Sequence, residues 1–191
     1  MRKKKQKNKV IKKFKGSNKL IVVGSGHYED YKIIINTINH SNYKWIIAPH
    51  ENDEKEMKYI KNKITKKSIK WSNLKDVENI DVLIIDKIGL LKHLYFYADI
   101  VYIGGGFTKG IHNSLEAAVF GKPLIFGPKY SEFQEAEYFV KHKIAFPINT
   151  ENAFKSALKS NINISDLQKK TLKFFNQNKG NLQKIIDQVF D

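Results

Sequence analysis

Five short runs of apolar residues divide the chain and predict β-strands. In each run the apolar residues occupy consecutive positions, which is typical of a strand that is buried on both faces. The predicted strands span residues 19–25, 44–50, 81–86, 99–106 and 122–128. This pattern favours a parallel sheet that is covered on both sides.

Patterns with helical spacing lie between these runs and after them. The predicted helices span residues 29–40, 53–67, 89–98, 113–120, 132–142, 150–160, 164–177 and 180–190. The alternating order of strands and helices predicts an α/β fold, a doubly wound Rossmann-like parallel sheet. The sequence shows no internal repeat and no interdomain linker. We therefore predict one domain over residues 19–191, preceded by a basic flexible leader, residues 1–18.

The formal net charge of +15 is concentrated in this leader. Residues 1–19 contain Arg2, nine lysines and no acid. A solvated, partly disordered segment is the simplest interpretation, and attraction to anionic membrane lipids is the more specific one. Arg2 is the only arginine of the chain, and base and phosphate recognition favours arginine, so nucleic acid is not expected as a partner.

Composition excludes further classes of site. The chain has no cysteine, which rules out disulfides and thiolate metal ligands. The six histidines have no metal-ligand spacing and there is no acidic metal-binding cluster, so neither a metal nor a cofactor is expected. There is no apolar run of about 18 residues and no signal peptide. We expect a cytoplasmic protein, soluble or peripheral.

Polar residues follow the ends of the predicted strands, where ligands bind in such sheets. They lie in residues 24–30, 48–51, 86–89, 104–116 and 127–137. This convergence predicts a polar cleft along one edge of the sheet.

Three successive glycines, Gly104, Gly105 and Gly106, are the most unusual of these features. One interpretation is a tight turn. The other is a loop whose amides bind a phosphate or carboxylate beside a helix start, with Lys109 nearby. Three glycines exceed what a turn needs, so we favour the ligand loop, although the spacing matches neither the GxGxxG fingerprint nor the P-loop.

Asn113 and Glu116 also have two interpretations. As N-cap and third helical residue they form a capping-box arrangement. Alternatively, the Glu116 carboxylate accepts hydrogen bonds from vicinal hydroxyls of a ribose or sugar. The roles can coexist for Asn113.

The first two loops carry further candidates. Ser25 and His27 follow the first strand, and the Ser25 hydroxyl is a candidate phosphate contact. Glu29 and Asp30 open the next helix, where the helix dipole favours acids. His50 lies beyond the end of the second strand, as a surface histidine or a ligand contact.

The stretch DKIGLLKHLYFYADIVYIGGGFTKGIHNSLEAAVFGKPLIFGPKYSEFQEA, residues 86–136, resembles bacterial 3-deoxy-D-manno-octulosonic acid (Kdo) transferases. The shared motifs are D-x-x-G, Y-x-x-A-D, G-G-[SG]-F, G-x-H-N-x-L-E, G-K-P and F-G-P. GSGHYED is similar to the family's G-S-x-x-x-E-D segment, and IIAPHE is similar to its P-H loop. The resemblance covers roughly residues 20–148.

The resemblance implies the carboxyl-terminal, donor-binding half of a metal-independent GT-B glycosyltransferase. The donor would be CMP-Kdo and the acceptor a lipid A precursor, at the inner face of the cytoplasmic membrane, in lipopolysaccharide biosynthesis. The implied donor contacts are Ser25, His50, Gly104, Gly105, Gly106, Phe107, His112, Asn113 and Glu116. Among them, the Gly104–Phe107 loop and the helix at Asn113 would face the phosphate, and Glu116 would hold the ribose.

The sequence departs from the family in two respects. Pro49-His50 replaces an Arg-His pair, which puts one cationic donor contact in doubt. The chain also begins near the family's interdomain junction, and the family's other half carries the acceptor site, membrane anchor and catalytic base. Three explanations stay open: that half is a separate chain, the gene is a degraded relic, or the reading frame is truncated. No catalytic residue is assigned. The alternatives are a nonenzymatic module that binds nucleotides or anionic surfaces, and a GT-B transferase that uses a UDP-sugar.

Overall fold

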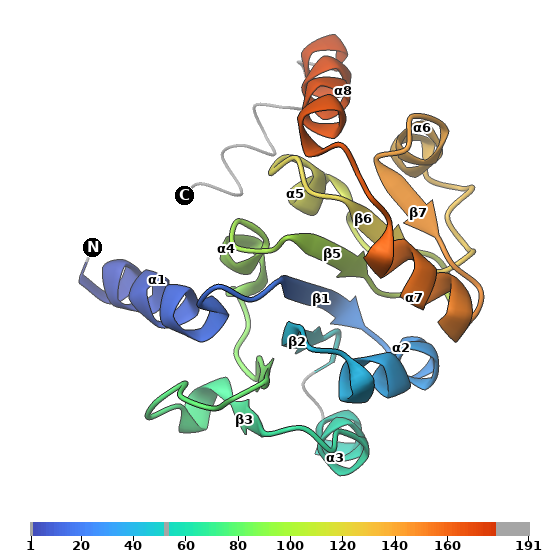
Figure 1. Ribbon diagram of the computed structural model, residues 1–191. Coiled ribbons are helices and arrows are strands. Elements are labelled where there is room, and N and C mark those ends of the chain that lie inside the picture. The colour runs from blue at the N-terminus through green and yellow to red at the C-terminus, as the bar shows by residue number, and fades with distance from the viewer. Residues whose placement is uncertain (1, 52–53, 179–191) are drawn as a thin grey trace.

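The computed structural model describes residues 2–51 and 54–178, with the side chains of residues 2–8 excepted. Its strands form a seven-stranded sheet in the order β3-β4-β2-β1-β5-β6-β7, and every pair of neighbours is parallel (Figure 1). The strands are β1 Leu20–Gly26, β2 Lys44–Pro49, β3 Ser68–Lys70, β4 Val82–Ile84, β5 Ile100–Ile103, β6 Leu124–Phe126 and β7 Ala145–Pro147. The predicted doubly wound α/β fold is confirmed.

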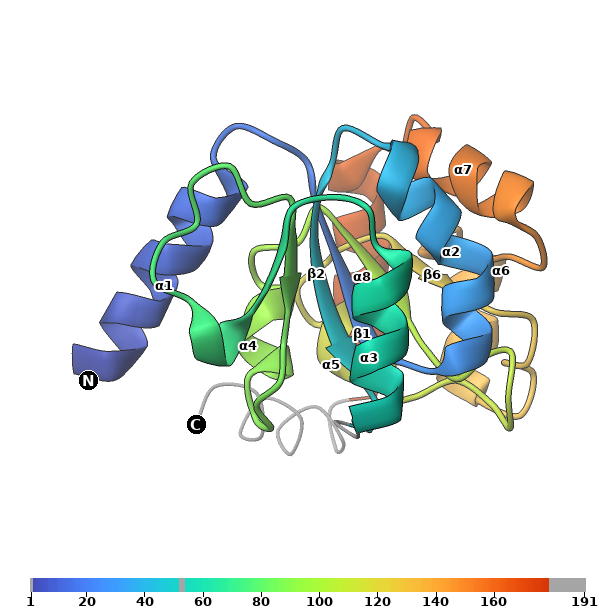
Figure 2. The same cartoon turned by 90° about the horizontal axis from the view of Figure 1, so that it is seen from below.

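Helices cover both faces of the sheet, as Figures 1 and 2 show. They are α1 Arg2–Lys15, α2 Tyr28–His40, α3 Glu54–Lys63, α4 Leu91–Tyr95, α5 Leu115–Ala118, α6 Gln134–Lys141, α7 Glu151–Lys159 and α8 Ile164–Gln177, with a 3-10 turn, η1, at Trp71–Asn73. Side chains of β1 alternate between the two resulting cores. Leu20 and Val22 pack in the core under α1, α4, α5, α6 and α8, whereas Ile21 and Val23 face α2, α3 and α7.

Two strands are absent from the prediction. β3 and β7 have three residues each and lie at the two edges of the sheet. Most of their side chains are only partly buried. Their sequences, SIK and AFP, therefore lack the apolar run that marks the central strands. The predicted helix 180–190 lies outside the described residues.

The basic leader differs from the prediction. Residues Arg2–Lys15 form helix α1, and its apolar residues Ile11 and Phe14 are buried, each 2% exposed, in the core. Lys15 forms an ion pair of 2.7 Å with Asp99, which immediately precedes β5. This corrects the expectation of a flexible segment, because two apolar side chains three positions apart share one face of a helix and can dock there.

Candidate functional site at the carboxyl edge of the sheet

The direction of chain progression reverses at β1. From this strand the chain proceeds outward through β2 to β3 at the edge and adds β4 between them, and it later returns to add β5, β6 and β7 on the other side. The carboxyl ends of β1 and β5 therefore border a topological switch point, where open α/β sheets bind ligands. The predicted site residues lie at the end of β1 and after β2 and β5, which are the three adjacent central strands.

The end of β1 has an irregular backbone. The register between β1 and β2 shifts between Gly24 and Gly26, and Ser25 between them has a φ of 52°. A left-handed conformation is unfavourable for a residue with a side chain, and such residues cluster at functional sites. The bulge directs the chain into the loop that carries His27.

Asp30 connects two loops of the site. Its side chain is fully buried and accepts hydrogen bonds from the His27 amide at 2.9 Å, the Gly105 amide at 2.9 Å and the Tyr102 hydroxyl at 2.7 Å. Burial, and then the Asp30 charge, raise the pKa of Tyr102, which keeps its hydroxyl protonated as a donor. Asp30 therefore does more than complement the dipole of α2: it joins the loop after β1 to the loop after β5.

The glycine loop is packed more tightly than a simple turn. A Cβ on Gly104 would lie 2.1 Å from the Ser25 carbonyl oxygen, and a Cβ on Gly106 would lie 2.6 Å from the Gly127 amide nitrogen. Gly105 has a φ of 91°, and a Cβ there would lie 3.2 Å from His112 Nε2. All three positions thus require glycine because neighbouring loops approach them closely.

This packing corrects one expectation about the loop. The Gly104 amide donates to the Gly24 carbonyl, and the Gly105 amide donates to Asp30. Neither amide is therefore free to bind a phosphate. Phe107 is partly buried and would contact any Cβ placed on Gly127, so it helps to pack this loop against the one after β6. Ligand binding by the loop as a whole remains a prediction.

The predicted cap at Asn113 is also corrected. Helix α5 is a single turn, and its N-cap is Ser114. The Asn113 side chain accepts from the Leu115 amide at 3.0 Å and donates to Glu116 at 3.3 Å. Asn113 and Glu116 together still stabilise the start of α5. Asn113, however, lies one residue before the N-cap position that a capping box requires. Because Asn113 is exposed and Glu116 half-buried, both can still contact a ligand.

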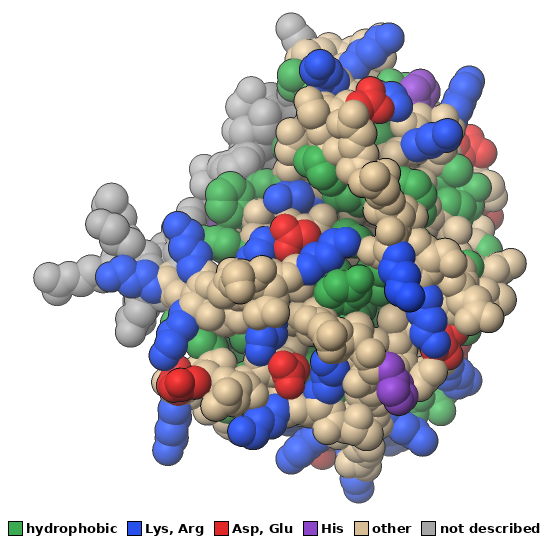
Figure 3. Space-filling model, viewed as in Figure 1, with side chains coloured by type: hydrophobic (Ala, Val, Ile, Leu, Met, Phe, Trp, Pro, Cys, Tyr) green, Lys and Arg blue, Asp and Glu red, His purple; other side chains and the backbone are tan. Residues whose placement is uncertain are grey.

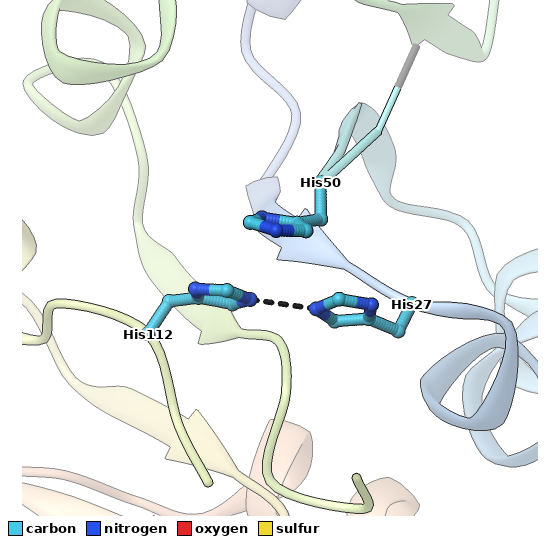
Figure 4. A group of neighbouring side chains, drawn as sticks. All are labelled: His27, His50 and His112. Atoms are coloured by element: carbon cyan, nitrogen blue, oxygen red, sulfur yellow. Dashed lines mark hydrogen bonds between the residues drawn. The ribbon is translucent and has the colours of Figure 1, made fainter. Parts of the chain in front are cut away.

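Three histidines from different loops meet at the switch point (Figure 4). His27 Nε2 and His112 Nε2 are 2.7 Å apart, with their rings inclined by only 12°. The His50 ring lies over both, with centroid distances of 4.5 Å to His27 and 4.1 Å to His112. We call His27, His50 and His112 the histidine cluster.

The charge state of the cluster follows from its packing. Burial, and then the neighbouring His50 and His27, lower the pKa of His112 to about 4. Burial and His50 also lower the pKa of His27, which Asp30, Glu29 and Glu51 only partly offset. His112 and His27 are therefore neutral imidazoles at pH 7, so that one ring of the Nε2 pair donates and the other accepts.

A cavity of about 450 Å³ opens beside the cluster, a size suited to a small molecule. Its walls include His27, Tyr28, Glu29, Glu51 and Tyr59. A cavity of about 520 Å³ lies at the opposite, amino edge of the sheet, beside Lys15, Lys19 and Lys122. None of the predicted donor contacts lines either cavity.

Of the three histidines, His27 is the one that is absent from the donor contacts implied by the family resemblance. It follows β1 directly, as His50 follows β2, and this shared position was the available signal. The three histidines are far apart in the chain, so no spacing motif connects them. Asp86, another polar residue after a strand, accepts hydrogen bonds from the amide and hydroxyl of Ser72 and has a structural role.

No described helix is both long enough and apolar enough to cross a membrane. No family model matches the chain. Its fold is that of the carboxyl-terminal CMP-Kdo binding domain of WaaA from Acinetobacter baumannii. The two structures superpose with a TM-score of 0.76 at 18% identity, over 88% of this chain and 95% of that domain.

Curated relatives extend this likeness. The 3-deoxy-D-manno-octulosonic acid transferase of Chlamydia muridarum is 33% identical over 147 residues, which are 73% of this chain and 34% of that protein. The enzyme of the same name from Rickettsia typhi is 29% identical over 188 residues, 90% of this chain and 39% of that protein. A bifunctional glycosyltransferase/methyltransferase of Fusobacterium nucleatum is 29% identical over 174 residues, 86% of this chain and 27% of that protein.

Fold and strand order together define a Rossmann-like α/β domain. The chain belongs to the 3-deoxy-D-manno-octulosonic acid transferase family, as the sequence motifs predicted. It spans between 27% and 39% of the length of the three relatives described.

Proposed function

We propose that this chain binds CMP-Kdo and serves as the donor-binding part of a Kdo transferase, which transfers Kdo to a lipid A precursor in lipopolysaccharide biosynthesis. The observation that carries the proposal is the convergence of the loops after β1, β2 and β5 at the switch point, in a member of this family. Donor binding at such a point is the general behaviour of open α/β sheets.

The contacts of the donor are assigned chiefly to side chains. Because the Gly104 and Gly105 amides are engaged internally, the phosphate of CMP would be held by the side chains of Ser25, Asn113, His50 and His112. Glu116 would accept from the ribose hydroxyls. Hydrogen bonds at the phosphate would stabilise the negative charge that grows on CMP as it leaves the anomeric carbon of Kdo.

Acceptor binding and the catalytic base would reside in the part of the relatives that this chain does not match. The chain by itself should therefore bind the donor without transferring Kdo. We expect transfer only when the chain is combined with such an acceptor-binding domain, at the cytoplasmic face of the membrane.

Calorimetric titration of the chain with CMP tests donor binding. We expect a Kd of about 0.1–1 mM, since CMP lacks the contacts of the sugar. Glu116→Gln should weaken binding at least about 10-fold, through loss of a charge-assisted hydrogen bond. Glu78→Gln changes an exposed carboxylate in the loop before β4, near the opposite edge, and should leave the affinity unchanged. A folded chain that gives no heat with millimolar CMP would refute the proposal.

The same titration with UMP distinguishes the proposed function from the alternative, a transferase that uses a UDP-sugar. CMP should bind more tightly, because the 4-amino group of cytosine donates where uracil has an accepting carbonyl. Equal or tighter binding of UMP would favour the UDP-sugar enzyme. If Glu116→Gln lowers only the melting temperature, the pairing of Asn113 with Glu116 is purely structural.

A second function, docking on an anionic membrane surface, is favoured by the orientation of α1. Its apolar residues Ile11 and Phe14 face the core, which leaves Lys9 and Lys12 exposed; Lys13 is exposed too but is paired with Asp76 at 2.8 Å. Figure 3 shows lysine side chains spread widely over this side of the molecule. Such side chains are attracted to anionic lipids by about 1 kcal/mol each near the surface.

Co-sedimentation with vesicles of phosphatidylglycerol and phosphatidylcholine tests the docking. The double variant Lys9→Glu/Lys12→Glu is preferable to deletion of residues 1–18, which would remove Ile11 and Phe14 from the core. Binding should fall in the variant and in high salt. Equal sedimentation of variant and wild type would exclude α1 as the docking surface.

A further inference from the structure

The histidine cluster has the composition of a transition-metal site. Three imidazoles each offer a nitrogen, and the three nitrogens all lie within 4.8 Å of one another. Imidazole is a preferred ligand of Zn²⁺, Co²⁺, Ni²⁺ and Cu²⁺, and three histidines with one open position form a recurrent zinc site. We propose that His27, His50 and His112 bind one divalent transition-metal ion of the zinc class.

The geometry needs only a small adjustment to accept the ion. Zinc binds imidazole nitrogen at about 2.0–2.1 Å in tetrahedral geometry, so two ligand nitrogens stand about 3.4 Å apart. His27 Nε2 and His112 Nε2 are 2.7 Å apart and would separate by less than about 1 Å. The exposed ring of His50, which lies over this pair, would turn one nitrogen toward the gap between them.

The backbone holds all three ligands in place. The His27 amide donates to Asp30, the His50 amide donates to the Gly26 carbonyl at 2.9 Å and the His112 amide donates to the Gly104 carbonyl at 3.0 Å. The His27 amide is thus tied to the helix that follows it, the His50 amide to the end of β1 and the His112 amide to the start of its own loop. A ligand set that is held in this way loses little conformational freedom when the ion binds.

The surroundings favour a cation. Among the described residues, the cavity beside His27 is lined by Glu29, Glu51 and Glu56, with Lys55 as the single lysine. Asp30 adds a buried carboxylate that contacts the His27 amide. These acidic groups attract a divalent ion and disfavour its loss. The spacing of the histidines along the sequence predicted no metal site, because the cluster exists only in the folded chain.

The ion would share His50 and His112 with the proposed CMP site, but the metal proposal does not rest on CMP binding. A chain that fails to bind CMP can still bind the ion, and a chain that binds CMP can lack the metal site. The two proposals are tested by different readouts, visible absorption of the metal and heat of nucleotide binding. Failure of one is therefore distinguishable from failure of the other.

Titration of the purified chain, free of any histidine tag, with Co²⁺ tests the site. Co²⁺ in tetrahedral coordination by imidazole gives much stronger visible absorption than the hydrated ion. We expect this absorption to saturate at one ion per chain and to disappear when one equivalent of Zn²⁺ is added. Zn²⁺ should also raise the melting temperature, because it binds only the folded chain.

Single substitutions identify the ligands. His27→Ala, His50→Ala and His112→Ala should each weaken Co²⁺ binding at least about 10-fold, since even loss of a second-shell partner costs that much. His40→Ala is the matched control, because His40 is exposed at the far end of α2. His50 is exposed as well, so His50→Ala tests the site without endangering the fold.

The results that would overturn the proposal are specific. Co²⁺ that keeps the weak spectrum of the hydrated ion excludes the site. So does binding that His50→Ala leaves unchanged, or that His40→Ala weakens as much as His50→Ala does.

Discussion

Replacing Asp30 tests whether the site depends on one buried carboxylate. In Asp30→Ala three donors lose their acceptor: the amides of His27 and Gly105 and the hydroxyl of Tyr102. Each buried donor without a partner costs about 1–3 kcal/mol, and relief of the buried charge offsets part of the sum. We expect Asp30→Ala to lower the free energy of unfolding by about 3–4 kcal/mol.

The alternative explanation of Asp30, an acid that complements the dipole of α2, predicts a much smaller effect. Glu29 lies in the same helical turn but is exposed, so Glu29→Ala removes only dipole complementarity, about 0.3–1 kcal/mol. The two substitutions therefore separate the explanations. Asp30→Asn keeps the shape and one acceptor oxygen and should cost about 1–2 kcal/mol.

Urea denaturation followed by circular dichroism measures these differences, and thermal melting checks them. At about 2–4 °C per kcal/mol for a chain of this size, Asp30→Ala should melt roughly 6–16 °C below the wild type. A double-mutant cycle of Asp30→Asn with Tyr102→Phe should give a coupling energy of about 1 kcal/mol. If Asp30→Ala lowers the free energy of unfolding no more than Glu29→Ala does, the reasoning is refuted. The hydrogen bonds of Asp30 between the loops after β1 and β5 would then not stabilise the site.

Three further predictions follow from the same geometry. Unfolded His112 binds a proton near pH 6.5 and folded His112 only near its pKa of about 4, so stability should fall as the pH drops through this window. The loss should be about 1–2 kcal/mol after discounting for solvent screening, and a urea series in pH should show less loss in His112→Gln. Gly104→Ala places a Cβ 2.1 Å from the Ser25 carbonyl, so it should cost about 3 kcal/mol in urea denaturation; an unchanged midpoint would contradict the close packing. Phe14→Ala should cost about 3–5 kcal/mol by the same assay because Phe14 is 2% exposed, whereas Lys12→Ala should be neutral; equal midpoints would mean that α1 does not dock.

The central part of the fold was predictable because burial on both faces leaves a strong local signal. β1, β2 and β5 follow directly from runs such as LIVV and IVYI. The same argument fails at the edges of the sheet, where β3 and β7 are short and half covered. It fails again for α1, where a dense run of lysines hides the two apolar residues that dock the helix.

The candidate site was predictable in its position and not in its contacts. The sequence placed Ser25, His50 and the glycine loop at the carboxyl edge, because strand ends can be counted along the chain. It assigned the Gly104 and Gly105 amides to a ligand, whereas the fold uses them to join loops. Which donor pairs with which acceptor depends on distances between strands, and a single sequence does not contain those distances.

The sequence by itself determined the class of the fold, the family and the edge of the sheet at which the site lies. Only the tertiary structure brought His27, His50 and His112 within 4.8 Å of one another and placed Asp30 between two loops. The physical reason is the same for both. Hydrophobic periodicity is a local property of the chain, whereas contacts between loops of different strands arise only when parallel pairing aligns the ends of β1, β2 and β5.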